Sequence, residues 1–242
     1  MSAETDGAVL GIVGGMGPYA SAEFLLTVYR EASLRSTSGV EQALPRCLLD
    51  SDPTFPDRTE AIRQGRYLEM TERLRSRIRG LLSQGASRVV LTCVTAHHFA
   101  AGLEPELRRP LISLVDVIVD ELRALEPVDG KLLMLATRGT RTARIFDRSP
   151  RWPSVADRVV MPGAAAQATV HQLLYRLKQG TVTEDLLRQV EQLADQHGCG
   201  GVIAGCTEAH MLTRSLRARP GARLVVDPLD AIAVNLDKLL DL

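Results

Sequence analysis

The 242-residue chain has few aromatic residues, no excess of either charge and few cysteines. Phe, Trp and Tyr make up 4% of it, which is too little for a platform that stacks the bases of single-stranded nucleic acid. The 29 basic residues balance 29 acidic ones, so no net charge attracts nucleic acid or an anionic membrane. We therefore expect the partner to be a small molecule, with no nucleic acid and no membrane involved.

The chain also lacks a long apolar segment. No apolar run reaches the roughly 18–20 residues that cross a bilayer as a helix. The first residues, "MSAETDGAVLG", contain neither a basic region nor a cleavable apolar segment of the kind that directs secretion. The expected location is the cytoplasm.

Cysteine is scarce as well. Four cysteines are too few for a disulfide scaffold in a chain of this length, so free thiols are expected. No Cys-x-x-Cys occurs and no group of His, Cys and carboxylates has zinc spacing, so no metal site is predicted. Cys47 and Cys199 are interpreted as small buried apolar residues.

What the chain does have is an alternation of short apolar segments with segments of helical character. Continuous apolar strands separated by helices indicate parallel sheets that are covered on both faces. In the segment 59–83 the leucines and isoleucine at 74, 78, 81 and 82 share one helical face, which predicts a single helix there. Strands are expected at 8–15, 46–49, 88–92, 132–136, 158–161, 201–204 and 223–226, and a further helix at 21–35.

Two pairs of segments repeat. "RVVLTCVTAHHF" at 88–99 is similar to "GVIAGCTEAHML" at 201–212, and "GAVLGIVGGMG" from Gly7 is similar to "GKLLMLATRGT" from Gly130. We therefore expect two pseudo-symmetric α/β lobes, each a parallel sheet covered by helices, with the active site in the cleft between them. The predicted first lobe comprises 1–112 and 218–242, the second comprises 113–217, and 126–130 links them.

The repeat places Cys93 and Cys206 at equivalent positions, each at the carboxyl end of a strand. Ligands of parallel sheets bind at these strand ends, so the two thiols are expected to face one substrate. Two thiols on opposite faces of a carbon can act as base and acid and so invert it. His97 and His210 follow each cysteine by one helical turn and are expected to face back toward the thiols. His98, His171 and His197 have no such context and are interpreted as structural or surface residues.

Several segments resemble the signatures of the cofactor-independent aspartate/glutamate racemases. "GIVGGMGPYAS" at 11–21 is similar to the opening Gly-Gly-Met-Gly-Pro segment of that family, with Ser21 where a threonine is usual. "CVTAH" at 93–97 resembles Cys-Asn-Thr-Ala-His, and "GCTEAHML" at 205–212 resembles the second signature, Gly-Cys-Thr-Glu. The resemblance covers essentially the whole chain. It implies a homodimeric isomerase that racemises an acidic amino acid without pyridoxal phosphate or any other cofactor.

The resemblance also implies roles for single residues. "FPDRTEAI" at 55–62 is similar to the segment whose arginine holds the distal carboxylate of the substrate, which points to Arg58. "YRLKQG" at 175–180 gives Lys178 as a second carboxylate contact, and "LATRGT" at 135–140 gives Thr137 and Thr140 beside the α-carboxylate. The predicted site comprises Cys93 and Cys206 as catalytic residues, His97 and His210 as supporting residues, and Gly15, Met16, Ser51, Arg58, Val94, Thr95, Thr137, Thr140, Lys178, Thr207 and Glu208 as substrate-binding residues.

Three alternatives remain at this point. Val94 stands where the family has an asparagine, which favours an enzyme redirected to another substrate, such as an isomerase, a decarboxylase or an enzyme for a modified amino acid. A non-catalytic ligand-binding homologue is the second. The third is a dinucleotide-dependent oxidoreductase, because residues 15–20 fit G-x-G-x-x-A after a strand. Its acidic candidates, Asp50 and Asp52, lie more than 30 residues further on, whereas about 20 is usual.

Overall fold

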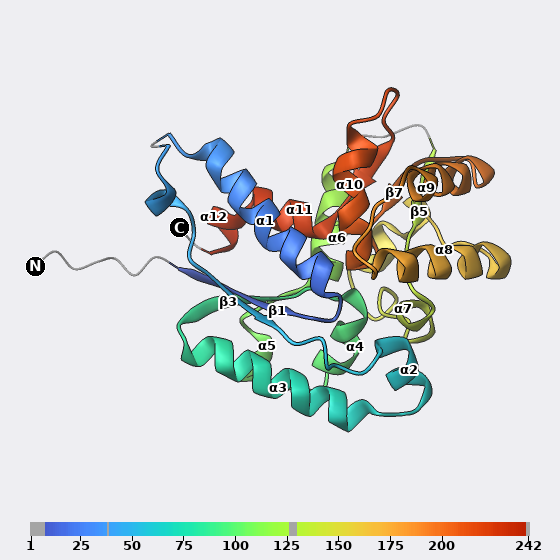
Figure 1. The fold of residues 1–242 in the computed structure, drawn as a ribbon. Helices are drawn as coiled ribbons and strands as arrows, with labels where there is room; N and C mark the ends of the chain where they lie inside the picture. The colour runs from blue at the N-terminus through green and yellow to red at the C-terminus, as the bar shows by residue number, and fades with distance from the viewer. Residues whose placement is uncertain (1–7, 38, 126–129, 241–242) are drawn as a thin grey trace, which may run out of the picture.

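The computed structural model describes residues 8–37, 39–125 and 130–240, and it contains two parallel sheets of four strands each (Figure 1). The first sheet has the order β2-β1-β3-β4 and the second the order β6-β5-β7-β8. We call each sheet, together with the helices that cover it, a lobe. The strands are β1 (Val9–Gly14), β2 (Cys47–Ser51), β3 (Ala86–Leu91), β4 (Leu111–Ile112), β5 (Lys131–Met134), β6 (Val159–Val160), β7 (Cys199–Ile203) and β8 (Leu224–Val226).

The two sheets confirm the repeat that the sequence predicts. Strand order is the same in both, with β1 and β5 in equivalent places and β3 and β7 beside them. Even the irregularities correspond, because the β1–β3 register shifts between Val9 and Leu10 and the β5–β7 register shifts between Lys131 and Leu132. The predicted α/β fold with two lobes is therefore correct. The predicted link at 126–130 lies, apart from Gly130, outside the described residues.

One predicted helix is in fact two. The segment 59–83 forms α2 (Arg58–Arg63) and α3 (Tyr67–Ser83), and Gly65 between them has φ +67°. That left-handed conformation is open to glycine at little cost and ends the first helix. The other α-helices are α1 (Pro18–Arg35), α4 (His97–Ala100), α5 (Pro105–Arg108), α6 (Leu114–Ala124), α7 (Arg138–Thr142), α8 (Ala164–Leu177), α9 (Glu184–Gln196), α10 (His210–Arg217), α11 (Pro228–Val234) and α12 (Leu236–Leu239). Short 3-10 helices are η1 (Glu41–Ala43), η2 (Val94–Ala96), η3 (Trp152–Ser154), η4 (Ala156–Arg158) and η5 (Thr207–Ala209).

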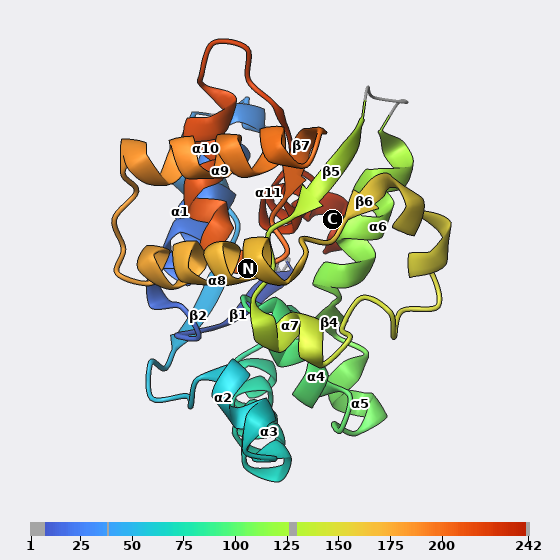
Figure 2. The same cartoon turned by 90° about the vertical axis from the view of Figure 1, so that its right-hand side faces the viewer.

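An apolar cluster of the described residues joins the two lobes. It contains Leu10 and Phe24 from the first lobe, Leu132 and Trp152 from the second, and residues of α6 and α11. Figure 1 shows α1, α11 and α6 side by side in the middle of the molecule. Each lobe has a second apolar cluster, which includes residues of α3 in the first lobe and of α8 and α9 in the second. Figure 2 shows these helices on the outer side of their lobes. The lobes therefore fold around a shared core.

The described part of the segment 218–242, which is predicted to belong to the first lobe, contacts both lobes. Its strand β8 pairs with β7 and so belongs to the second sheet, because Gly201, Val202 and Ile203 align with Leu224, Val225 and Val226. Its helix α11, in contrast, packs against α1 of the first lobe and against α6. The segment thus crosses between the lobes, and the lobe boundaries stay a prediction. No helix among the described residues has the length and apolar character needed to cross a membrane.

Candidate functional site

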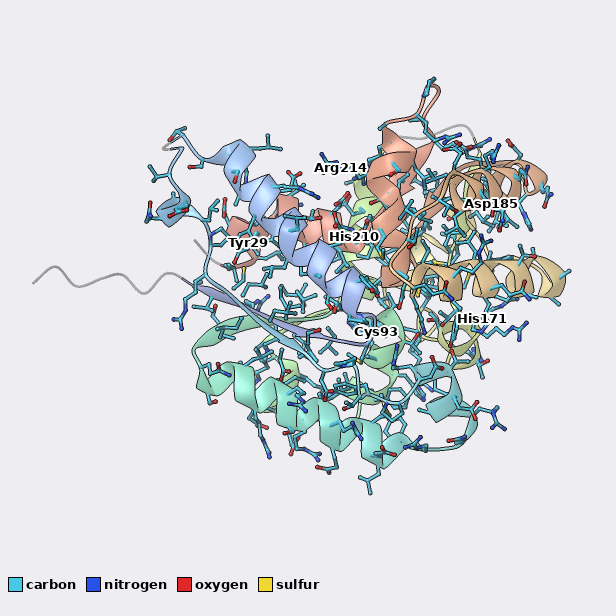
Figure 3. All side chains as sticks on the ribbon, viewed as in Figure 1. Tyr29, Cys93, His171, Asp185, His210 and Arg214 are labelled. Atoms are coloured by element: carbon cyan, nitrogen blue, oxygen red, sulfur yellow. The ribbon has the colours of Figure 1, made fainter. Side chains whose placement is uncertain are left out.

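The two repeated cysteines lie at the junction of the lobes. Cys93 is the N-cap residue of η2 after β3, and Cys206 is the N-cap residue of η5 after β7. Both are about 6% exposed and line the same cavity, whose volume is about 10 Å³, and Figure 3 shows Cys93 near the centre of the molecule. A strand that runs into a helical turn leaves its last side chains at the carboxyl edge of the sheet, and two related sheets bring two such edges together. The cavity is lined by Met16, Asp57, Arg58, Thr59, Cys93, Thr95, Thr137, Lys178, Cys206 and Glu208.

Arg58 brings a buried cation into this cavity. It is the first residue of α2, and its guanidinium donates hydrogen bonds to the carbonyl oxygens of Pro56, at 3.0 Å, and of Met16. Burial lowers the pKa of Arg58, but the nearby charges of Cys93, Asp57 and Glu208 outweigh this effect and raise it. The side chain is therefore a permanent cation, and a thiolate at Cys93 would be attracted to it.

Asp57, Lys178 and Tyr175 form a bridge between the lobes, which we call the interlobe bridge. Asp57 Oδ2, from the first lobe, accepts hydrogen bonds from Tyr175 Oη at 2.7 Å and from Lys178 Nζ at 3.1 Å. Burial opposes the charge of Asp57, yet Lys178, Tyr175 and the backbone N–H of Glu60 together lower its pKa to about 2. Burial likewise lowers the pKa of Lys178, but Glu208 and other acidic neighbours outweigh it and raise that pKa. At neutral pH the bridge is an ion pair.

Cys206 has a different partner. Its Sγ donates a hydrogen bond to Glu208 Oε2 at 2.8 Å. Burial, the charge and hydrogen bond of Glu208 and the charge of Cys93 raise the pKa of Cys206 well above its usual value, and Lys178 only partly offsets them. The two thiols therefore differ in their surroundings: a cation stands beside Cys93, and a carboxylate stands beside Cys206.

Three threonines from both lobes form a hydroxyl cluster beside Cys93. Thr95 Oγ1 lies 2.7 Å from Thr140 Oγ1 and 3.3 Å from Thr137 Oγ1, and the last two are 3.1 Å apart. Thr95 and Thr137 line the cavity, and Thr140 lies behind them. Hydroxyls can rotate their hydrogens toward an anion, so this cluster can solvate a carboxylate.

Among the described residues, the hydrogen bonds of the two supporting histidines are to groups other than the thiols. His97 Nε2 accepts from the N–H of Leu114, so its Nδ1 donates to the Cys93 carbonyl oxygen at 3.2 Å. Burial lowers the pKa of His97, which keeps the ring neutral. His210 bonds to Asp227 through Nδ1 at 2.7 Å and to Thr27 through Nε2 at 3.0 Å. The ring of His97 thus binds two backbone groups, whereas the ring of His210 joins α10 to the side chains of Asp227 and of Thr27 in α1.

One group of side chains has a composition that could suit a metal ion. His210, Asp227 and Asp230 have ligand atoms within 4.8 Å of one another. Their hydrogen-bonding groups are already paired, however: His210 with Asp227, and Asp230 with Arg217. We interpret the group as a buried hydrogen-bond network that ties α10 to α11.

The structure places other predicted site residues outside the cavity lining. Val94 packs in the shared apolar cluster, and Ser51 is exposed at the end of β2. Thr207 uses its hydroxyl to bond to the Thr92 carbonyl oxygen at 2.9 Å. Gly15 has φ +81°, and a Cβ there would come within 2.2 Å of the Asp52 backbone, so glycine is needed for the turn. Their predicted roles in substrate binding stay predictions.

Sequence reasoning missed Asp57, Thr59 and Tyr175. A signal for Asp57 was present, because Asp57 and Glu60 have the spacing of a helix N-cap and its third residue, and Asp57 Oδ1 accepts from the Glu60 N–H at 3.0 Å. Asp57 also lines an outer pocket of about 620 Å³ beside the cavity, together with residues of α2, α7 and α8. Asp57 thus stands between the outer pocket and the thiols.

Comparisons with known proteins agree with this architecture. The family model described as Asp/Glu/Hydantoin racemase matches residues 13–236. A glutamate racemase of Pseudomonas aeruginosa strain UCBPP-PA14 is 29% identical over 175 residues, a match that covers 66% of this chain and 60% of that enzyme. The chain thus spans about three fifths of that curated relative.

Two solved structures illustrate the likeness of fold. The aspartate racemase of Picrophilus torridus superposes with a TM-score of 0.75 at 22% identity, covering 97% of this chain and 95% of the other. The glutamate racemase of Francisella tularensis in complex with D-glutamate gives a TM-score of 0.62 at 13% identity, covering 98% of this chain and 81% of the other. At these identities the structures show a common fold.

Proposed function

The chain belongs to the Asp/Glu/hydantoin racemase family, and from this premise we propose that it inverts the α-carbon of an acidic amino acid, with Cys93 and Cys206 as the two proton carriers. The observation that carries the proposal is that both thiols line one small cavity between two equivalent lobes. A substrate held there has one thiol on each face of its α-carbon. This is the arrangement that inversion by proton transfer requires.

The proton route follows from the surroundings of each thiol. A Cys93 thiolate, beside the Arg58 cation, takes the α-hydrogen as a proton and becomes a thiol. The electron pair of the broken C–H bond is delocalised into the α-carboxylate. The Cys206 thiol then gives its proton to the opposite face of the carbon and becomes a thiolate. The reverse sequence converts the other enantiomer.

Stabilisation of the carbanion is the demanding part of this reaction, because an α-hydrogen is a very weak acid. Buried donors that are fixed before the reaction contribute most to such stabilisation. The cavity offers the hydroxyls of Thr95 and Thr137 for the α-carboxylate, and the cations of Arg58 and Lys178 for the distal carboxylate. An acidic amino acid matches this set, and these assignments are part of the proposal.

Substrate binding requires the site to open. A cavity of about 10 Å³ holds roughly one water-sized sphere, so no amino acid fits between the thiols as they stand. The interlobe bridge is the polar contact that closes the cavity toward the outer pocket. A dicarboxylate that arrives from the outer pocket can replace Asp57 as the partner of Lys178. This exchange opens the bridge and keeps the Lys178 cation paired with a carboxylate.

An enzyme redirected to another reaction or another substrate is less well supported. A family decarboxylase uses a single cysteine, whereas two buried thiols line this cavity. A redirected substrate rested on Val94, whose side chain packs in the shared apolar cluster and is absent from the cavity lining. Independence of pyridoxal phosphate and a homodimeric state remain predictions from the family resemblance, and a cytoplasmic location remains a prediction from the sequence.

The proposal is tested by incubating the purified protein with L-aspartate and, separately, L-glutamate in D2O. We expect deuterium at the α-carbon together with formation of the D-enantiomer. Proton NMR measures the exchange, and chiral chromatography measures the enantiomers. Exchange reports carbanion formation even when net inversion is slow. If neither L-aspartate nor L-glutamate showed exchange or inversion, the proposed function would be refuted.

A further inference from the structure

One oxygen of the carboxylate at residue 208 is buried without a hydrogen-bond partner among the described residues. Glu208 is 2% exposed, and its Oε2 accepts a hydrogen bond from the Cys206 thiol, but no donor of the described residues reaches Oε1. A buried carboxylate oxygen without a donor is unfavourable, so it calls for an explanation. Glu208 lines the same cavity as the thiols, so a ligand in that cavity can supply the missing hydrogen-bond donor to Oε1.

The position of Oε1 is fixed from two sides. Gly17, at the turn between β1 and α1, packs so closely that a Cβ there would lie 2.5 Å from Oε1. On the other side the Cys206 thiol holds Oε2 at 2.8 Å. While Oε2 accepts the hydrogen bond of the thiol, Oε1 therefore lies against Gly17.

The charge of Glu208 decides what kind of group can approach it. The cations of the cavity, Arg58 and Lys178, suit carboxylates, whereas Glu208 repels them. A hydrogen bond in which the donor or the acceptor is ionised is roughly twice as strong as one between neutral groups, and a cationic donor is also attracted by the charge of the carboxylate. An α-ammonium is the one cationic group of an acidic amino acid, and its place is next to the carbon that lies between the thiols.

We infer that Glu208 selects substrates with a free α-ammonium group: Oε1 accepts a hydrogen bond from the ammonium while Oε2 keeps the hydrogen of the Cys206 thiol. The inference rests on the proposed function and narrows its substrate class within the family. Acidic amino acids with an unblocked amino group are bound, whereas cyclic hydantoins, hydroxy acids and plain dicarboxylates lack the cation that Glu208 requires.

The test compares each amino acid with the diacid that lacks only the ammonium. Dissociation constants of L-aspartate and succinate, and of L-glutamate and glutarate, are measured by calorimetry for the wild-type protein and for Glu208→Gln. The wild type should prefer the amino acid by about tenfold or more in at least one pair. Glu208→Gln should lose about tenfold of this preference, with binding of the diacid unchanged or tighter. Glu69→Gln, which removes a half-buried, ion-paired carboxylate on α3, is the matched control and should keep the preference.

Each outcome has a definite meaning. Equal binding of amino acid and diacid by the wild type in both pairs overturns the inference, even if Glu208→Gln does not fold. A preference that survives Glu208→Gln, or an equal weakening of both ligands, overturns it as well. If the wild type exchanges the α-hydrogen but does not prefer the amino acid over the diacid, only this inference is contradicted and the proposed function stands. A preference without exchange supports this inference and contradicts the proposed racemisation instead.

Discussion

At the scale of single residues, Cys93 and Val94 are neighbours with opposite surroundings. The Cys93 thiol lines the cavity, whereas Val94 is 1% exposed within the apolar cluster that both lobes share. The family resemblance suggested a changed substrate, because Val94 stands where the family has an asparagine. The structure gives the position a packing role, because the 3-10 turn of η2 directs consecutive side chains to different sides.

This difference makes a prediction for Val94→Asn. An amide placed in an apolar cluster loses its hydrogen bonds to water, so the free energy of unfolding should fall by about 1–3 kcal/mol. Chemical denaturation monitored by circular dichroism measures the change. A stable variant with markedly faster turnover of aspartate would show instead that residue 94 reaches the reacting centre.

The residues that sequence reasoning found and those that it missed differ in kind. Cys93, Cys206, Arg58 and Lys178 lie within short motifs, and the structure brings all four to one cavity. Tyr175 was missed because its contact with Asp57 joins residues 118 positions apart. No local pattern records such a contact, and it follows only from the way the lobes pack.

At the scale of elements, the interlobe bridge joins α2 to α8 and the residue that follows it, Lys178. The ion pair between Asp57 and Lys178 holds these elements together across the site. Its strength depends on the charge of Asp57, whose pKa is lowered from 3.8 to about 2. A carboxylate whose pKa is lowered by folding stabilises the folded state at every pH above its pKa in the unfolded chain. This stabilisation is lost as the pH falls through the folded-state pKa of about 2.

Asp57→Asn should therefore reduce the free energy of unfolding at pH 7. We expect about 1 kcal/mol, because a third of the Asp57 side chain is exposed and solvent screens the pair. Asparagine keeps the helix N-cap, so the loss reports on the bridge. The difference from the wild type, measured by urea denaturation, should be the same at pH 7 and pH 5. A difference that disappears between those values would contradict the lowered pKa. Tyr175→Phe, which keeps the ion pair, should cost less.

The elements themselves were predicted with uneven success. The strands at 8–15, 46–49, 88–92, 132–136, 158–161, 201–204 and 223–226 were all placed correctly to within a few residues. The two-residue strand β4 was missed, since so short a run has no periodicity of its own. The break between α2 and α3 was also missed, although Gly65 marks it, because the apolar spacing of α3 dominated the pattern.

At the scale of the whole molecule, the repeat predicted the two lobes but not how they share a core. The cluster of Leu10, Phe24, Leu132 and Trp152 with residues of α6 and α11 extends through both lobes. Residue patterns show which faces are apolar, but they do not show which faces pack together. The crossing of α11 to the first lobe, while β8 stays in the second sheet, is the clearest example.

A shared core predicts that both lobes unfold together. Thermal unfolding should give one transition, with the calorimetric enthalpy equal to the van't Hoff enthalpy. Differential scanning calorimetry tests this. Two resolved transitions would mean that each lobe is stable by itself and that the shared cluster contributes little to folding.

The central claim is that Cys93 and Cys206 act on opposite faces of one carbon. The most direct test is α-hydrogen exchange in D2O for Cys93→Ser and Cys206→Ser, each measured separately with the L- and the D-enantiomer of the substrate that the wild type converts. A serine hydroxyl is far less acidic than a thiol, so both variants should lose net inversion. Each should still exchange only the enantiomer whose α-hydrogen faces the remaining cysteine, and the two variants should retain opposite enantiomers. If both variants lost exchange of the same enantiomer, or if either variant still inverted the substrate, the account would be contradicted.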